Sequence, residues 1–112
     1  LMDMVFDSSL ITEEEVDRMW DFSMYPGSMN AMFREFGKSW EGFKPTEIEG
    51  IPTNTLLIWG EEDTICPISM GEWYDSHLPE SKFIRLQNIG HNPQFECPDK
   101  CLDEITSWMN SL

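Results

Sequence analysis

The chain has 112 residues, a length that suits one small domain, and its 40% hydrophobic and 12% aromatic content is enough for a folded core. Its 21 acidic residues outnumber 7 basic ones, and the formal net charge of −14 disfavours nucleic acid and anionic membranes as partners. No apolar run approaches the ~20 residues of a membrane span, so we expect a folded protein that spans no membrane.

Signals typical of an amphipathic helix open the chain. Thr12 precedes Glu13–Glu15, and a threonine in this position can cap a helix while a glutamate three residues later reaches back. Val16, Met19 and Trp20 then recur at helical spacing. Such an apolar stripe more often packs in a core than binds a ligand.

A second amphipathic helix is expected after the Pro26-Gly27 break. Ser28 can cap it and Gly37 can close it. The segment Lys38–Pro52 contains Pro45, Gly50 and Pro52 and indicates a connector. The apolar stripe of this helix has the spacing i, i+3, i+4 and i+7 and consists of Met29, Met32, Phe33 and Phe36.

From Thr55 the pattern changes to strand, helix and strand. Leu56–Trp59 is apolar without alternation, as in a parallel strand buried on both faces, and Gly60 ends it. A helix should begin at Pro67 and stop before Pro79, and Lys82–Leu86 should form a second strand. Strand, helix and strand at this spacing predict a crossover unit and a parallel sheet.

A last helix over Asp99–Leu112 should cover that sheet with one apolar stripe. Two strands and about four helices leave each strand without a neighbour on one side. The missing neighbour could come from upstream chain, from a second polypeptide or from another copy, and upstream chain is the simplest choice. The stripe of the last helix comprises Cys101, Ile105, Trp108 and Leu112.

Asp63 and His91 are the candidate catalytic residues. Each follows the carboxyl end of a predicted strand, where ligands sit in open α/β sheets. A carboxylate that accepts a hydrogen bond from Nδ1–H orients an imidazole and stabilises its protonated form, so that Nε2 can take a proton from a nucleophile. No Gly-x-Ser-x-Gly occurs in the chain, and the pair therefore lacks its nucleophile.

Each of these positions also has a purely structural interpretation. Asp63 can cap the turn before Cys66, and His91 can be an ordinary loop histidine. His77 has no partner motif and is expected to be a surface or packing histidine. Glu96 lies near a helix start, where negative charge is stabilised, and is expected to be structural.

The cysteines Cys66, Cys97 and Cys101 form an odd set without metal-type spacing to a histidine. We expect no metal site and no cofactor, and a reducing, cytoplasmic location. Cys97 is the candidate for a reactive thiol, because a helix start can lower a thiol pKa. Residue 1 is leucine, so an upstream targeting segment stays open.

Two stretches resemble a known family. Ile51–Pro67, with its Leu-Leu-Ile-Trp-Gly-Glu-Glu-Asp run, resembles the penultimate strand and acid loop of the α/β-hydrolase superfamily, and Gly90–Pro98 resembles its histidine loop. Phe6–Arg18 more loosely resembles the late cap region of the branch with epoxide hydrolases, haloalkane dehalogenases and carbon–carbon bond hydrolases. The resemblance implies an α/β fold: a C-terminal part of an α/β-hydrolase, with parallel strands, a crossover helix and helices from the cap.

On this resemblance residues 1–50 are the end of the cap and a connector, and residues 51–112 are the C-terminal part of the core. Asp63 matches the triad acid and His91 the triad base, while the nucleophile, Ser or Asp, belongs to the amino-terminal half of the fold. The implied activity is cofactor-independent hydrolysis of a small ester-like or related substrate; a non-catalytic ligand-binding or scaffold member of the fold, or an inert fragment, is the alternative. Cap residues that could line an apolar substrate pocket are Met24, Tyr25, Met29, Met32 and Phe33.

Overall fold

The computed structural model describes residues 4–36 and 42–112, and these form two compact units. One unit joins the chain up to Leu10 with Lys44–Leu112, and the other spans Ile11–Phe43. These limits differ from a boundary at residue 50, because the segments before Leu10 and after Lys44 both pack with the sheet. The assignment of residues 1–50 to a cap and connector stays a prediction.

The unit Ile11–Phe43 contains helices α1, Glu13–Met24, and α2, Ser28–Phe36. Thr12 caps α1 as predicted, because its Oγ1 accepts the Glu15 N–H at 3.2 Å. The predicted cap of α2 is displaced by one residue: Ser28 is the first helical residue, and the Gly27 carbonyl accepts the Ala31 N–H at 2.9 Å. Gly37, the predicted end of α2, lies outside the described residues.

In the stripes of α1 and α2, the apolar side chains that the structure describes are exposed, contrary to the expectation of core packing. Trp20 is 64% and Phe33 65% exposed. Two packed helices bury only the faces that they turn toward each other. The remaining apolar side chains of α1 and α2 need a further packing partner to be buried. The residues expected to line a substrate pocket are exposed too, and that role stays a prediction; they are Met24, Tyr25, Met29, Met32 and Phe33.

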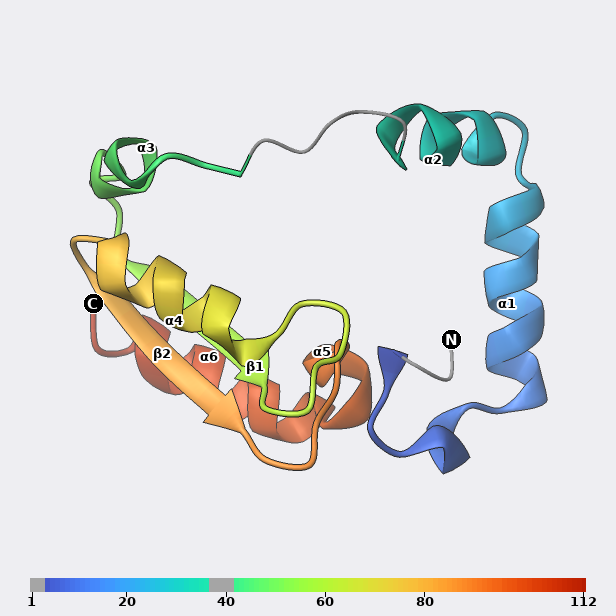
Figure 1. Ribbon diagram of the computed structural model, residues 1–112. Helices are drawn as coiled ribbons and strands as arrows, with labels where there is room; N and C mark the ends of the chain where they lie inside the picture. Colours follow the sequence, from blue (N-terminus) through green and yellow to red (C-terminus); the bar gives the residue numbers. More distant parts are fainter. Residues whose placement is uncertain (1–3, 37–41) are drawn as a thin grey trace. The chain divides into compact units, whose positions relative to one another are not determined.

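The other unit is built on two parallel strands, β1, Thr55–Gly60, and β2, Ser81–Leu86. Thr55 lies opposite Ser81 and Gly60 opposite Leu86, so both strands end at the same edge of the sheet. Helix α4, Ile68–His77, connects them, and helix α6, Pro98–Met109, lies on the opposite face of the strands (Figure 1). The predicted crossover unit and parallel sheet are confirmed.

Three short helical segments were missed by the sequence patterns. A 3-10 turn spans Ser8–Leu10, and α3, Pro45–Glu49, lies within the predicted connector. Helix α3 forms because proline suits its first turn and the Glu47 carboxylate accepts the Lys44 N–H at 2.7 Å. Helix α5, Pro93–Glu96, follows the histidine and is again opened by proline.

The last helix is shorter than predicted. It begins at Pro98 and ends at Met109 instead of running from Asp99 to Leu112. Leu112 is 70% exposed and does not contribute to the stripe that covers the sheet. Asn110 and Ser111 make the last turn-type hydrogen bonds to carbonyls of the helix, so the backbone leaves the helical path before residue 112.

The core around the sheet is small. Its buried apolar side chains are Val5, Ile48, Leu86 and Cys101, and β1 is half-buried along most of its length instead of buried on both faces. In the part of the chain that the structure describes, each strand has one unpaired edge. A two-stranded sheet needs further strands or helices for independent stability. Further strands of the fold would pair with these two edges.

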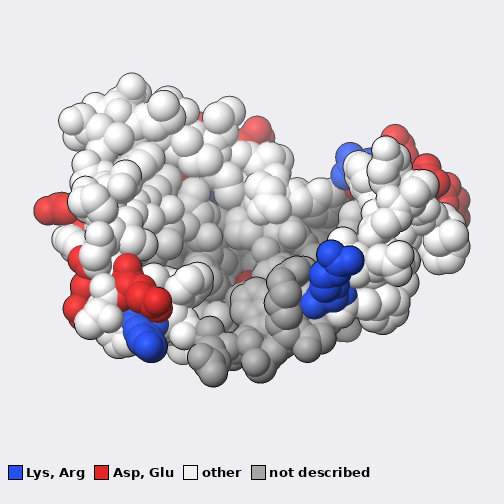
Figure 2. Space-filling model, turned by 90° about the horizontal axis from the view of Figure 1, so that it is seen from above, with Lys and Arg blue, Asp and Glu red and all other residues white. Residues whose placement is uncertain are grey.

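Acidic side chains are distributed over the surface in separate groups, some with basic side chains beside them (Figure 2). Arg85 pairs with Glu72 at 2.8 Å and Lys82 with Glu104 at 3.3 Å, all partly exposed. Exposed pairs of this kind contribute little stability. Among the described residues no helix has the length and apolar character needed to cross a membrane.

Candidate active site

The ends of the two strands bring their following loops together. The Glu62 N–H donates to the Ile89 carbonyl at 3.1 Å, and the Ile89 N–H donates to the Glu62 carboxylate at 3.1 Å. Gly60 makes this approach possible, since a Cβ built on it would lie 2.2 Å from the carbonyl oxygens of Ile89 and Gly90. The loop carrying Asp63 and the loop carrying His91 are therefore tied to each other by backbone contacts.

This close approach makes Gly60→Ala a severe substitution. The added methyl group would overlap two backbone oxygens, which can move only by separating the loops, so we expect the free energy of unfolding to fall by about 3 kcal/mol or more. Urea denaturation measures the change. Gly50→Ala is the matched control, because its Cβ would meet backbone oxygens only at 3.4 Å or beyond; equal losses in both variants would contradict the crowding of the loops.

Asp63 and His91 are in direct contact, as the sequence predicts. His91 Nδ1 lies 2.9 Å from Asp63 Oδ2. The Asp63 side chain is 5% exposed and that of His91 28%. The second Asp63 oxygen, Oδ1, accepts the backbone N–H groups of Ile65 at 2.9 Å and Cys66 at 2.8 Å. Asp63 thus caps its own turn and binds the imidazole at once, because the two functions use different oxygens.

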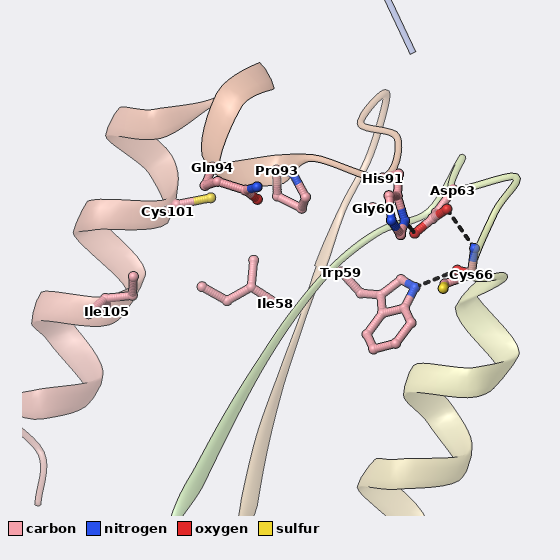
Figure 3. A pocket seen from close by; sticks show the side chains of 10 residues that line it. All are labelled: Ile58, Trp59, Gly60, Asp63, Cys66, His91, Pro93, Gln94, Cys101 and Ile105. Atoms are coloured by element: carbon pink, nitrogen blue, oxygen red, sulfur yellow. Dashed lines mark hydrogen bonds and ion pairs between the residues drawn. The ribbon is translucent and has the colours of Figure 1, made fainter. Parts of the chain in front are cut away.

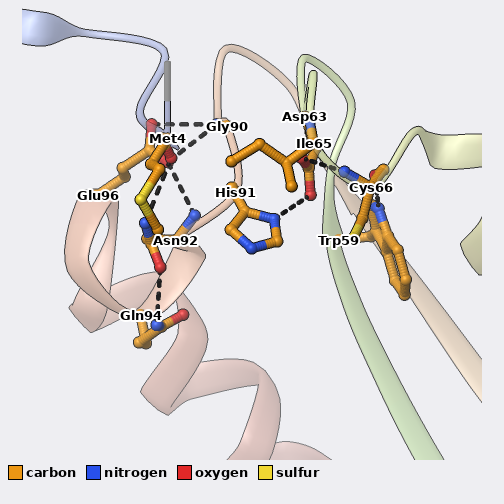
Figure 4. A network of polar contacts seen from close by, with 10 residues as sticks. All are labelled: Met4, Trp59, Asp63, Ile65, Cys66, Gly90, His91, Asn92, Gln94 and Glu96. Carbon is orange, nitrogen blue, oxygen red and sulfur yellow. Dashed lines mark hydrogen bonds and ion pairs between the residues drawn. The ribbon is translucent and has the colours of Figure 1, made fainter. Parts of the chain in front are cut away.

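The contact orients the imidazole ring. Figure 4 shows Nδ1 directed at Asp63, while Nε2 points away from the carboxylate. A carboxylate at Nδ1 favours the tautomer with the proton on Nδ1, which leaves Nε2 free to accept a proton. The geometry is that of an acid and a base ready for a nucleophile.

A carboxylate on the far side of the histidine holds the loop in place. Glu96 accepts three backbone N–H groups, from Gly90 at 3.0 Å, Asn92 at 3.2 Å and Phe6 at 2.7 Å. From the sequence, Glu96 was expected only to have a structural role near a helix start. A Glu five residues after the histidine, at the end of a proline-led turn, was the available signal, but its donors come partly from the distant amino-terminal segment.

That amino-terminal segment also contacts the histidine itself. The His91 N–H donates to the Met4 carbonyl at 2.9 Å, and the Asn92 side-chain amide donates to the same oxygen at 3.3 Å (Figure 4). A Cβ on Gly90 would lie 2.8 Å from the Phe6 nitrogen, so the backbones approach closely there. Nothing in the local pattern of residues 4–6 indicates this contact.

A hollow of about 310 Å³ opens beside the pair. Figure 3 shows that the side chains around this hollow come from β1, from the loops that carry Asp63 and His91, and from α5 and α6. Its walls are mainly apolar, a common property of small-molecule sites. The residues that line it are Ile58, Trp59, Gly60, Asp63, Cys66, His91, Pro93, Gln94, Cys101 and Ile105.

Two cysteines of this hollow have raised pKa values. Burial, with the nearby Asp63 carboxylate as the smaller cause, raises the pKa of the Cys66 thiol. Burial, aided by the neighbouring Cys97 thiol, raises the pKa of Cys101 to about 11. All three cysteines are free thiols. Because Cys101 stays protonated in the fold, it acts as a buried apolar group at neutral pH.

Cys101 should therefore be protected from alkylation. Its pKa is 9.0 in the absence of the fold and about 11 within it, so the thiolate fraction at pH 8 falls roughly 100-fold. We expect Cys101 to react correspondingly slowly with iodoacetamide, at a rate that rises with pH up to about pH 11. Mass spectrometry of the peptides measures the extent of alkylation. The raised pKa stabilises the fold below pH 9, and that contribution disappears between pH 9 and about 11. Alkylation of Cys101 at the rate of the urea-unfolded protein would contradict this.

The remaining candidate residues lie elsewhere or have no assigned chemistry. His77, near the end of α4, has Nδ1 2.7 Å from the Trp73 carbonyl and its ring against the Trp73 indole. This agrees with the packing histidine expected from the sequence. Cys97 lies at the start of α6 with an extended φ of −146°, and a reactive role for it stays a prediction.

No protein-family model matches the chain. Among curated proteins, the uncharacterized hydrolase YugF of Bacillus subtilis is 33% identical over 110 residues, which cover 97% of this chain and 40% of that protein. A pimeloyl-(acyl-carrier protein) methyl ester esterase of Nitrosomonas europaea is 29% identical over 62 residues, 53% of this chain and 25% of that protein. The chain thus spans well under half the length of these relatives.

A solved structure agrees with them in fold. The meta-cleavage product hydrolase of Pseudomonas fluorescens IP01 superposes with a TM-score of 0.84 at 24% sequence identity, covering 97% of this chain and 42% of that one. The homologues and the structural neighbours are α/β-hydrolases, and the parallel strands with helices on both faces are the corresponding part of their fold. This chain has the carboxyl-terminal part of the α/β-hydrolase fold, and the relatives that it matches are hydrolases of that superfamily.

Proposed function

We propose that the complete protein is a cofactor-independent hydrolase of a small ester-like substrate, in which His91 is the base and Asp63 its acid partner. The observation that carries the proposal is the 2.9 Å contact between His91 Nδ1 and a buried Asp63 oxygen beside an apolar hollow. The nucleophile belongs to a part of the fold that this chain does not contain.

In the proposed reaction His91 Nε2 takes the proton of a serine hydroxyl as its oxygen attacks the substrate carbonyl. The imidazolium, stabilised by Asp63, then gives that proton to the departing alcohol. Water, deprotonated by the same nitrogen, releases the acid product and restores the enzyme. With an aspartate nucleophile, His91 would serve only the second step, by activating water against an ester of the enzyme.

The ester-like class of substrate rests on two supports. The hollow beside the pair has an apolar lining, which suits an uncharged or weakly charged small molecule. The Nitrosomonas relative is named as a methyl ester esterase. Esters are therefore the first class of substrate to assay.

Hydrolysis of a panel of p-nitrophenyl esters by the complete protein and its Asp63→Asn variant tests the proposal. In the variant, the amide oxygen would keep the two backbone N–H bonds of Ile65 and Cys66, which turns the NH₂ group toward His91. Nδ1 must then accept and Nε2 carry the proton, so the base is lost. We expect kcat to fall on the order of 10²–10⁴-fold with little change in KM.

Two outcomes would overturn the proposal. Equal turnover by both proteins would remove the role of Asp63. Saturable binding of small esters without any turnover by the unaltered protein would instead favour a ligand-binding member of the fold.

A further inference from the structure

Cys66 completes a cluster of three potential metal ligands with Asp63 and His91. One ligand atom from each residue lies within 4.8 Å of those of the other two. The sequence predicted no metal site because none of the cysteines has a metal-type spacing to a histidine. In the structure the strand ends bring Cys66 and His91 together, although they are 25 residues apart in the chain. A thiol is not required by the proposed hydrolysis, so its place beside the pair is unexplained by that function.

The spacing of these atoms suits a zinc-sized ion. With bond lengths of about 2.0 Å to nitrogen or oxygen and 2.3 Å to sulfur, tetrahedral ligand atoms lie ~3.3–3.6 Å apart. The Asp63 oxygen and His91 Nδ1, at 2.9 Å, need to separate slightly. Because all three ligand atoms lie within 4.8 Å of one another, a change of the Cys66 side-chain torsion angle can bring its sulfur to bonding distance of the ion.

The charges and the surrounding hydrogen bonds also favour a cation. The Asp63 carboxylate and a Cys66 thiolate would together neutralise a divalent ion, so the loaded site would carry no net charge. The Cys66 backbone is fixed on both sides, because its N–H donates to Asp63 Oδ1 and its carbonyl accepts the Trp59 indole N–H at 2.8 Å. Such outer contacts hold ligands in position.

We propose that Asp63, Cys66 and His91 form a binding site for a thiophilic divalent cation such as Zn²⁺ or Cd²⁺, with water as a fourth ligand. On binding, the Cys66 thiol loses its proton to solvent, and the metal takes the position of the proton between His91 Nδ1 and Asp63. The neutral imidazole then carries its proton on Nε2. A base in that state cannot accept a proton, so the cation is a reversible inhibitor of any hydrolysis that uses this pair.

Titration of the complete protein with Co²⁺ tests the site without any assay of activity. We expect near-ultraviolet sulfur-to-cobalt charge-transfer absorption and visible bands of tetrahedral intensity, both displaced by Zn²⁺. Cys66→Ser should abolish the charge-transfer band and raise the dissociation constant for Zn²⁺ on the order of 10–100-fold. Cys97→Ser is the matched control and should keep both the band and the affinity.

Two results would overturn the proposal. One is absence of a charge-transfer band in the unaltered protein at millimolar Co²⁺, with a cooperative thermal transition showing that the protein is folded. The other is loss of the band in Cys97→Ser and its persistence in Cys66→Ser, which would place the metal on the thiols at the start of α6. Neither result depends on the protein being a hydrolase, so failure of the metal site and failure of the proposed function are distinguishable.

Discussion

Replacing His91 by alanine is expected to lower kcat for ester hydrolysis by the complete protein on the order of 10³–10⁴-fold, the upper part of the range for general-base catalysis. Every proton transfer in the proposed reaction uses Nε2 of this one ring. The Asp63 carboxylate cannot replace it, because it is 5% exposed and both of its oxygens are already hydrogen-bonded. Initial rates at saturating substrate measure the effect.

His77→Ala is the matched control for that experiment, since it removes the other histidine of the chain. Helix α4 runs back from the carboxyl ends of the strands, so His77 lies at the opposite end of the sheet, against Trp73. We expect its kcat to stay within about twofold, because the substitution removes only contacts within α4: the ring packing on Trp73 and the hydrogen bond to its carbonyl. A similar loss of activity in both variants would mean that either substitution damages the fold, and the role of His91 would be unsupported.

Replacing Glu96 by alanine is expected to lower the free energy of unfolding by about 2–4 kcal/mol. The substitution leaves the N–H groups of Gly90, Asn92 and Phe6 without their carboxylate acceptor. Hydrogen bonds to a charged group contribute ~1.5–3 kcal/mol each, and water entering the partly exposed site replaces some of this. Urea denaturation of the complete protein measures the change.

A surface glutamate on α4 provides the comparison. Glu72 pairs with Arg85 at 2.8 Å, but both side chains are close to half exposed. Glu72→Ala should therefore cost less than about 1 kcal/mol. Glu96→Gln should fall between the two alanine variants, because one amide oxygen can keep part of the contacts. If Glu96→Ala lowers the free energy of unfolding no more than Glu72→Ala does, the hydrogen bonds from the histidine loop to Glu96 do not contribute to stability.

Local patterns predicted the elements on which the site is built. The apolar run before Gly60 predicted β1, the spacing after Pro67 predicted α4, and the parallel order followed from their succession. These predictions succeed because strand and crossover helix depend on periodicity and on breakers close in the chain. The pattern missed α3 within the predicted connector, where Pro45 and Glu47 supply a helix start despite the neighbouring breakers.

Packing could not be predicted in the same way. The stripes of α1 and α2 predict burial, yet Trp20 and Phe33 are exposed. Hydrophobic periodicity predicts which face of a helix is apolar and tends to be buried. It does not predict which segment packs against that face. Likewise the continuous apolar run of β1 predicted two buried faces, whereas two strands and their helices leave it half-buried.

The sequence by itself predicted that an acid and a histidine follow neighbouring parallel strands, and with that the fold class and the candidate pair Asp63 and His91. Only the tertiary structure decided that Cys66 joins the pair and that Glu96 and Met4 hold the histidine loop. The reason is physical: strand order follows from local periodicity, whereas these contacts join loops and an amino-terminal segment up to about 90 residues apart. Most of the groups that meet there are backbone N–H and carbonyl groups, which leave no mark in the local pattern of residue types.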